Sequence, residues 1–222
     1  MSPAQRHPHP HMDSLYVSDT CGTRVQCLEE DETLQQAVEA LRLANDGAAT
    51  GGSSGAGKKA GVATCRMDEA LEPIISAGQA IAEFDGVEFE YAIASKLPLV
   101  QADTRVLQEA VSNVLDNALK YVLVRGDNPS SPRVSLSIQP CKKPLKGVEV
   151  VIQDNGSGVV DEELKMLCQE SFRGQRCEHL PGTGLGLHIT QQLVDLLNGK
   201  LLLEPVGQGS GLRVRIQMNR AP

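Results

Sequence analysis

The sequence predicts an α/β fold in which helices cover a mixed β-sheet. Some segments repeat apolar residues every three or four positions, as amphipathic helices do, and others alternate apolar and polar residues, as strands do. These segments are interleaved along the chain, which is typical of one sheet covered by helices. Their order is not a regular strand–helix–strand repeat, so we expect hairpins and a mixed sheet. The hydrophobic fraction of 41% and the charged fraction of 22% are those of a globular protein.

The longest helical pattern covers residues 103–122, where an apolar stripe runs at helical spacing. A second helical pattern lies within 67–84, and we expect Pro73 to interrupt it, because proline lacks a backbone donor and collides with the preceding turn. A short helix is expected at 161–168 and a longer one at 185–197. Strands are predicted at 87–94, 133–139 and 147–153, near 199–204 and near 211–218.

The first 63 residues differ in composition from the rest. Residues 1–20 are rich in proline and histidine without periodicity, which predicts a flexible arm. Within 21–45, the stretch 31–45 places apolar residues at helical spacing and predicts an amphipathic helix. Residues 46–63 consist largely of Gly, Ala and Ser. They offer too little apolar surface to offset the entropy of ordering, so we expect a disordered insertion.

Charge and cysteine spacing exclude several classes of protein. Lys+Arg 21 against Asp+Glu 28 gives a net charge of −7, so no overall positive field is available to hold nucleic acid. No stretch approaches the roughly 18 apolar residues of a membrane span, and the first residues lack the apolar core of a secretory signal. The six cysteines form no C-x-x-C pair, which removes support for a zinc ribbon. We expect a soluble, intracellular protein that grips anions in a local pocket.

The first candidate site cluster lies on the helix predicted at 103–122. Asn113 and Asn117 are four residues apart and share one helix face, which Lys120 extends with a cation. An amide oxygen is a hard, neutral ligand that suits Mg²⁺, and lysine neutralises phosphate as a point charge. The alternative is that both amides only bond neighbouring backbone groups.

The second cluster is Asp154-Asn155-Gly156-Ser157-Gly158, directly after a strand rich in Val and Ile. An acid and glycines at a strand end form a tight turn whose backbone can approach a flat ligand closely. The carboxylate can accept a hydrogen bond from an exocyclic amino group such as that of adenine. An ordinary surface turn is the alternative.

The third cluster is Gly182-Thr183-Gly184-Leu185-Gly186-Leu187, which leads into a helix. Glycines at alternate positions allow successive N–H groups to converge on phosphate oxygens at a helix N-terminus. The motif is not the dinucleotide fingerprint G-x-G-x-x-G, because its third glycine comes one residue early. Its position after the other two clusters is what makes it informative.

The order N-x-x-x-N-A-x-K-Y, D-N-G-x-G, F-R-G and G-T-G-L-G-L resembles the N, G1, F and G2 boxes of sensor histidine kinases. These boxes belong to the catalytic ATP-binding domain, which is similar to those of heat-shock chaperone, gyrase and mismatch-repair ATPases. The resemblance covers about residues 67–219. It implies the Bergerat fold, a two-layer α/β sandwich whose mixed sheet is covered on one face by helices, with a mobile nucleotide lid.

The resemblance also implies a role for each motif residue, with ATP and Mg²⁺ as cofactors. Asn117 would bind the metal, Asn113 would support it and Lys120 would contact phosphates, so these three form the catalytic set. Asp154 would accept a hydrogen bond from adenine. The residues implied to bind the nucleotide are Tyr121, Asp154, Gly156, Gly158, Phe172, Arg173, Gly182, Thr183, Gly184, Leu185 and Gly186. Gly209 and Ser210 resemble the last glycine–hydroxyl element of the domain.

One position favours phosphoryl transfer over hydrolysis. Hydrolytic members of the superfamily place a glutamate four residues before the metal-binding asparagine, as a base for the attacking water. Here that position is Asn113, an amide that cannot act as a base. Glu109 lies a further turn back and is expected to be a surface charge. The segment between Gly158 and Gly182 is expected to be the lid, with Arg173 reaching the phosphates.

The sequence departs from a complete histidine kinase in one respect, because no histidine is followed by the usual acidic or polar residue and arginine of a phosphoacceptor motif. His188 is expected to be a satisfied packing residue. Either the chain is a fragment, with 21–45 a remnant of the dimerisation helices and 64–222 the catalytic domain, or it resembles kinases without the usual acceptor. Plant and algal chloroplast sensor kinases are such a group, and residues 97–119 look similar to theirs.

Two functions follow from the resemblance. The first is a kinase that phosphorylates a histidine on a separate acceptor domain, works with a response regulator, and forms a homodimer in the full-length protein. The second is a regulatory module that binds ATP and signals by conformation without transfer. Neither involves nucleic acid or a membrane span in this chain. The cytoplasm or the chloroplast stroma is the expected location.

Overall fold

The computed structural model describes residues 63–124, 131–141, 143–174, 183–207 and 210–222. The arm, the helical remnant and the insertion expected before residue 63 lie outside these ranges, and those predictions stay open. The described helices include none that is both long and apolar enough to cross a membrane.

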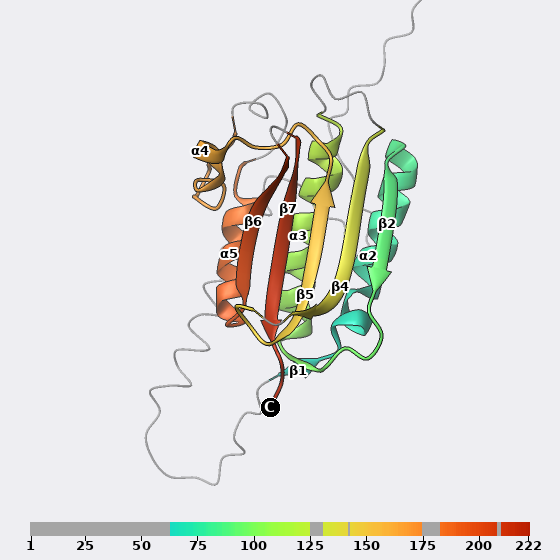
Figure 1. Ribbon diagram of the computed structural model, residues 1–222, viewed down its shortest axis with the longest axis vertical. Coiled ribbons are helices and arrows are strands. Elements are labelled where there is room, and N and C mark those ends of the chain that lie inside the picture. Colours follow the sequence, from blue (N-terminus) through green and yellow to red (C-terminus); the bar gives the residue numbers. More distant parts are fainter. Residues whose placement is uncertain (1–62, 125–130, 142, 175–182, 208–209) are drawn as a thin grey trace, which may run out of the picture.

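A five-stranded mixed sheet forms the centre of the fold (Figure 1). Its strands pair in the order β2, β4, β5, β7, β6. The β2–β4 pair is parallel, and the other three pairs are antiparallel. The prediction of a mixed sheet is therefore confirmed. The strands are β2 (Glu88–Ile93), β4 (Arg133–Cys141), β5 (Gly147–Asp154), β6 (Lys200–Gly207) and β7 (Ser210–Asn219).

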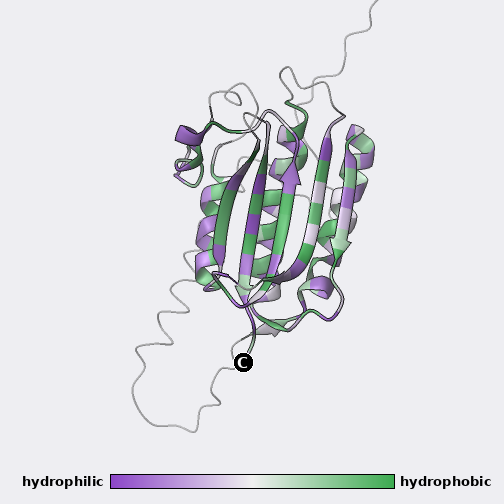
Figure 2. Ribbon diagram, in the orientation of Figure 1, coloured by the Kyte–Doolittle hydropathy of each residue, from purple (hydrophilic) through white to green (hydrophobic). Residues whose placement is uncertain are grey.

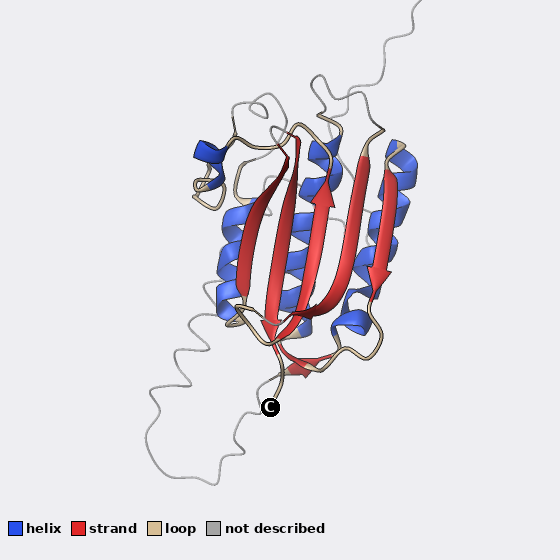
Figure 3. Cartoon of the chain, viewed as in Figure 1, coloured by secondary structure: helices blue, strands red, loops and turns tan. Residues whose placement is uncertain are grey.

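Three helices cover one face of this sheet, as the secondary-structure colouring shows (Figure 3). They are α2 (Met67–Asp85), α3 (Thr104–Val122) and α5 (Gly186–Leu196), and α3 lies between the other two. The apolar residues of the strands alternate with polar ones (Figure 2), so one side of each strand meets the helices. Val148, Val150 and Ile152 of β5 belong to the resulting core together with Leu107 and Leu115 of α3.

The sequence explains where α3 begins and which face it buries. The side chain of Asp103 accepts hydrogen bonds from the backbone N–H groups of Arg105 (2.9 Å) and Val106 (3.2 Å), which caps the first turn. The apolar stripe from Val106 to Val122 is buried, as its spacing predicts. Most polar residues on the remaining face, among them Asn113 and Asn117, are half-buried.

The predicted interruption at Pro73 is wrong, because α2 continues through the proline. A proline inside a helix removes one backbone hydrogen bond and disturbs the carbonyls of the preceding turn. Here the carbonyl of Ala70, three residues earlier, accepts a hydrogen bond from the side chain of Gln108 on α3 at 2.8 Å. Leu71 and Ile75 on either side of Pro73 are buried in the core. Packing against α3 therefore holds together a helix that its own sequence would weaken.

One helix is shorter than its sequence pattern predicts, and two short strands have no recognisable sequence pattern. Only Asp161–Leu164 of the predicted helix 161–168 forms α4, and turns follow it. The two-residue strands β1 (Thr64–Cys65) and β3 (Val100–Gln101) pair with each other at the end of the molecule where the C-terminus lies. The sequence analysis does not predict them, because two residues are too few to show an alternation.

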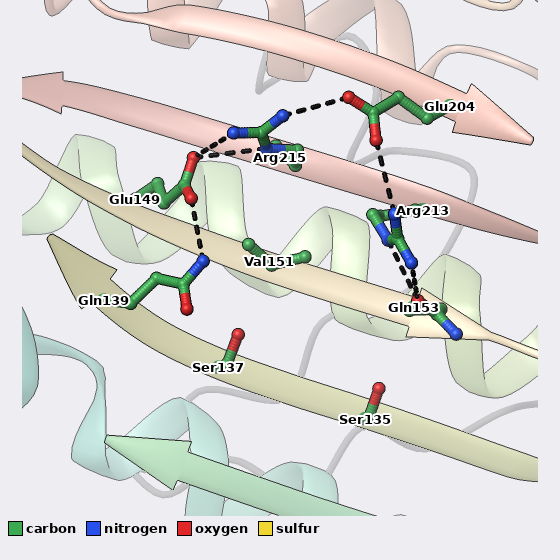
Figure 4. A pocket seen from close by; sticks show the side chains of 9 residues that line it. All are labelled: Ser135, Ser137, Gln139, Glu149, Val151, Gln153, Glu204, Arg213 and Arg215. Atoms are coloured by element: carbon green, nitrogen blue, oxygen red, sulfur yellow. Dashed lines mark hydrogen bonds and ion pairs between the residues drawn. The ribbon is translucent and has the colours of Figure 1, made fainter. Parts of the chain in front are cut away.

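The face of the sheet away from the helices carries a network of paired charges (Figure 4). Glu149 is almost fully buried, and it accepts hydrogen bonds from Arg215 (2.8 Å), Gln217 (2.8 Å) and Gln139 (2.9 Å). Burial alone would raise the pKa of Glu149, but these hydrogen bonds and the charge of Arg215 outweigh it and lower that pKa. Glu149 is therefore held as a carboxylate on the open face.

Replacing Arg215 with methionine should destabilise the fold by about 2 kcal/mol, because it leaves the buried Glu149 carboxylate without its cation. The matched control is Arg213→Met on the same strand, since its partners are the half-exposed Glu204 at 3.5 Å and the neutral amide of Gln153, so its loss leaves no buried charge unpaired. That control should cost less than about 1 kcal/mol. Urea unfolding of both variants measures the difference, and equal losses would contradict the special role of Arg215.

Candidate functional site

The first predicted cluster lies near the C-terminal end of α3, where Asn113, Asn117, Lys120 and Tyr121 are all half-buried. The side-chain nitrogen of Asn113 is buried, and no hydrogen-bond partner for it is present among the described residues. The ammonium of Lys120 lies 5.4 Å from the ring centroid of Tyr121, within range of a cation–π interaction. A buried donor without a partner is costly, so the Asn113 amide is suited to an additional acceptor.

Two acids on α3, Glu109 and Asp116, lie near the first cluster, and the burial of Glu109 contradicts the expectation of a surface charge. Glu109 is half-buried rather than a surface charge, and burial raises its pKa. Asp116 is also half-buried, and burial together with the charge of Glu109 raises its pKa to about 6. Asp116 is not one of the residues that the motifs indicate. The sequence does contain a signal for the position of Asp116. Residues at three- and four-residue intervals share one face of a helix, and this series is Glu109, Asn113, Asp116 and Lys120.

The second cluster forms the turn after β5. Asp154 ends that strand with 7% of its surface exposed, and its carboxylate accepts the backbone N–H of Gly156 at 2.8 Å. Burial raises the pKa of Asp154 to about 6, although hydrogen bonds from the backbone of Gly156 and Leu212 act in the opposite direction. The carboxyl group is therefore held in place at a site where ionisation is costly.

Gly156 brings this turn against the end of α3. A Cβ atom at Gly156 would stand 2.7 Å from the carbonyl oxygen of Tyr121, so only glycine permits this approach. The next residue, Ser157, donates its backbone N–H to the carbonyl of Val124 at 3.0 Å. The Gly156 carbonyl accepts the N–H of Gly211 on β7 at 2.9 Å. The first two clusters therefore meet at one edge of the sheet.

The third cluster begins α5 and lies beside the first. A Cβ atom at Gly186 would stand 3.2 Å from the side-chain nitrogen of Asn117, so the first turn of α5 lies directly against the predicted metal ligand. The buried hydroxyl of Thr190 donates to the Gly186 carbonyl at 2.8 Å and fixes that turn. The Thr183 hydroxyl accepts the N–H of Leu185 at 3.3 Å.

The F-box residues contact the glycine loop. Gly184 has a φ of +79°, and a Cβ atom there would stand 2.8 Å from the carbonyl oxygen of Phe172 and 2.9 Å from the side chain of Arg173. Gly158, at the beginning of the predicted lid, also has a positive φ, of +66°. The four motifs therefore converge, which their separation along the sequence could not show. Gly182 and Gly209 lie outside the described residues, and Ser210 begins β7.

This convergence agrees with comparisons of the chain with known proteins. Residues 102–221 match the family model described as histidine kinase-, DNA gyrase B- and HSP90-like ATPase. The chain belongs to this family. Its described part has the α/β fold of a histidine kinase catalytic domain, as a mycobacterial sensor histidine kinase structure, MprB, shows. That structure is 27% identical, matches with a TM-score of 0.57, and aligns over 72% of this chain and 100% of its own.

Two curated relatives of the histidine kinase-like ATPase are sensor kinases. Hik2 of Thermosynechococcus vestitus is 36% identical over 129 residues, which are 58% of this chain and 31% of the relative. The chloroplast sensor kinase of Phaeodactylum tricornutum is 35% identical over 102 residues, which are 43% of this chain and 18% of the relative. The chain thus spans about a third or less of these relatives, and the resemblance to sensor histidine kinases is confirmed. The roles of individual site residues remain predictions.

The close contact of Gly184 with Phe172 gives a test of how this ATPase domain holds nucleotide. Gly184→Ala should weaken nucleotide affinity at least roughly tenfold, because the added methyl group pushes the F-box backbone away. Gly86→Ala is the control, since Gly86 also has a positive φ (+68°) but no atom lies within 4 Å of the place where its methyl group would stand. Both variants should lose about 1 kcal/mol of stability through backbone strain. Equal nucleotide affinities, measured by calorimetry, would contradict the prediction.

Proposed function

We propose that this chain binds ATP with Mg²⁺ and transfers the γ-phosphoryl group to a histidine supplied from outside residues 64–222. The observation that carries the proposal is the convergence of three elements. Gly186 of α5 lies against Asn117 of α3, and Gly156 lies against the Tyr121 backbone while it binds the buried Asp154 carboxylate. A glycine loop, an amide and a carboxylate are suited to phosphates, metal and adenine respectively.

The residues on α3 fit a magnesium–nucleotide complex. Asn117 would offer its amide oxygen to the ion. The Asn113 nitrogen, which has no partner among the described residues, would donate to a phosphate oxygen. Lys120 would add a positive charge on the same helix face. When bound, Mg²⁺ supplies charge neutralisation for the β- and γ-phosphates. The chain's own contribution is then to orient the phosphates and to keep the adenine end fixed at Asp154.

Neither nearby acid occupies the position one turn before Asn117, where hydrolytic members of the superfamily place their base. Glu109 lies eight residues before Asn117, about 12 Å along the helix at the usual rise. Asp116 is adjacent to Asn117 in sequence and is therefore turned by about 100° around the helix axis. The position one turn before Asn117 is the amide Asn113. This arrangement supports phosphoryl transfer to another group over attack by water.

Phosphotransfer is the experiment that tests the proposal. The chain is incubated with γ-labelled ATP, Mg²⁺ and the two-helix acceptor segment of a sensor kinase from the same family. Acid-labile, base-stable label on a histidine of the acceptor is the expected result. Nucleotide binding without any transfer to acceptors would overturn the kinase proposal and leave the regulatory module. Absence of nucleotide binding would overturn both.

Partners and location belong to the same proposal. A response regulator would receive the phosphoryl group from the acceptor histidine, and the full-length protein would be a homodimer. Similarity to the Phaeodactylum tricornutum chloroplast sensor kinase supports the chloroplast stroma as a location, and the cytoplasm is the alternative. A fluorescent fusion of the full-length protein distinguishes the two compartments.

A further inference from the structure

A histidine on α5 ties this helix to the lid segment, residues 159–174. The Nδ1 atom of His188 lies 3.0 Å from the backbone carbonyl oxygen of Cys168. A carbonyl only accepts, so Nδ1 carries the hydrogen and donates it. The Nε2 atom lies 2.6 Å from the side-chain nitrogen of Gln192, one turn later on α5, and accepts its hydrogen. Both ring nitrogens are thus used, and Gln192 fixes the tautomer that donates to the lid segment.

The lid segment lies at the surface of the core and not within it. None of its residues from Asp161 to Gly174 is fully buried. After α4, the chain forms successive turns, closed by hydrogen bonds from the amides of Met166 (2.8 Å), Gln169 (2.8 Å) and Phe172 (3.2 Å) to carbonyls three residues earlier. These local bonds shape the segment, and α4 at its beginning also contacts β6. The His188 bond is the side-chain attachment that joins the middle of the segment, at Cys168, to α5.

The same segment contacts the glycine loop on the other side of Gly186. Gly184, two residues before Gly186, lies against Phe172 and Arg173, and His188, two residues after it, holds Cys168. The two attachments bracket the turn that lies against Asn117. A shift of Cys168 away from α5 would therefore carry Phe172 and Arg173 away from the glycine loop.

We propose that His188 is a positioning residue that fastens the lid segment to α5 and thereby lengthens the time for which nucleotide stays bound. The part about nucleotide rests on the proposed function, whereas the fastening does not. The hydrogen bond from His188 to the Cys168 carbonyl provides this attachment. Gln192 acts through His188, because it selects the tautomer that carries hydrogen on Nδ1.

The test compares His188→Leu with His188→Asn and with Gln191→Leu. Leucine keeps bulk but removes the donor, whereas asparagine places an amide N–H near the position of Nδ1. Gln191 is the matched control, because it is a half-buried glutamine on the same helix whose amide bonds Asp195 at 2.8 Å and not the lid segment. All variants are made in the 222-residue chain, and thermal unfolding checks their global stability.

Hydrogen exchange without nucleotide is the first readout. In His188→Leu, the amides of Met166, Gln169 and Phe172 should exchange roughly five times faster than in the wild type, which is the effect of losing one neutral hydrogen bond. His188→Asn should restore most of the protection, and Gln191→Leu should leave it unchanged. Unchanged exchange in His188→Leu would overturn the fastening role. If His188→Leu does not fold, Gln192→Leu replaces it. The exchange rate of the same amides should then rise about twofold, and an unchanged rate would overturn the fastening role.

Dissociation of a fluorescent ATP analogue, followed by stopped flow with Mg²⁺, is the second readout. The dissociation rate should rise about fivefold in His188→Leu, with the association rate nearly constant. Faster lid exchange with an unchanged dissociation rate would overturn the link to nucleotide. A wild-type chain that does not bind the analogue would instead overturn the proposed function, while the exchange result would still decide the role of His188.

Discussion

Asn117→Ala is expected to abolish Mg²⁺-dependent nucleotide binding and to leave the fold intact. The substitution removes the only amide oxygen assigned to the metal, beside the first turn of α5. Alanine is a better helix former than asparagine, so α3 should not lose stability. We expect an affinity loss of at least about 100-fold for a nonhydrolysable ATP analogue with Mg²⁺, and little further loss when the metal is chelated.

Calorimetric titrations with and without Mg²⁺ measure this effect. Asn219→Ala is the control, because Asn219 ends β7 at the opposite end of the sheet and bonds the carbonyl of Asn198 at 2.9 Å. Its nucleotide affinity should equal that of the wild type. An Asn117→Ala variant that binds the Mg²⁺ complex as tightly as the wild type would show that Asn117 does not hold the metal.

Asp154→Asn should stabilise the fold and weaken ATP binding at the same time. Burial raises the pKa of Asp154 from 3.8 to about 6, so the folded state prefers the protonated form more than the unfolded chain does. The free energy of unfolding that the protonated Asp154 carboxyl contributes is therefore lost as the pH rises from about 4 to about 6. At neutral pH the ionised group costs at most about 3 kcal/mol by the usual conversion, and asparagine removes that cost. Unfolding in urea at pH 5 and pH 7.5 should show the larger gain at pH 7.5.

The loss of ATP binding has a different cause. An asparagine whose oxygen accepts the Gly156 N–H turns its own NH₂ group toward the adenine amino group, and two donors then face each other. We expect ATP affinity to fall about tenfold or more, while GTP affinity changes little. Equal losses for both nucleotides would indicate that the turn after β5 has collapsed instead.

Local patterns in the sequence were sufficient for the elements with long periodic stripes. The stripe of α3 predicts that helix closely, and the Val/Ile-rich stretch before Asp154 predicts β5. Pro73 misled the prediction because its cost is offset by tertiary contacts with α3, including the Gln108 bond. Residues 165–168 look helical in composition but form turns, and none of them is fully buried in the core whose packing would sustain a short helix.

In the site, too, some features follow from local sequence patterns and others depend on neighbours in space. The order of the motifs indicates, through the resemblance it carries, that they belong to one site, whereas the contacts that bring them together are visible only in the structure. The satisfied state of His188 is as expected, since both ring nitrogens are bonded. What the sequence could not show is that the His188 bond reaches the lid segment, because Cys168 lies twenty residues away in the chain. The half-buried state of Glu109 likewise depends on neighbours in space.

The parallel β2–β4 pair means that the segment between these strands is a crossover, and α3 is the helix of that crossover. The helix that presents Asn113 and Asn117 is thus anchored at its beginning and end by strands that hydrogen-bond each other side by side. A fragment trimmed to the family match at residue 102 would delete β2 and α2, expose the edge of β4 and the α2-facing side of α3, and release one anchor. The smallest unit expected to fold as this sheet with its helix layer is therefore longer than the segment that matches the family model.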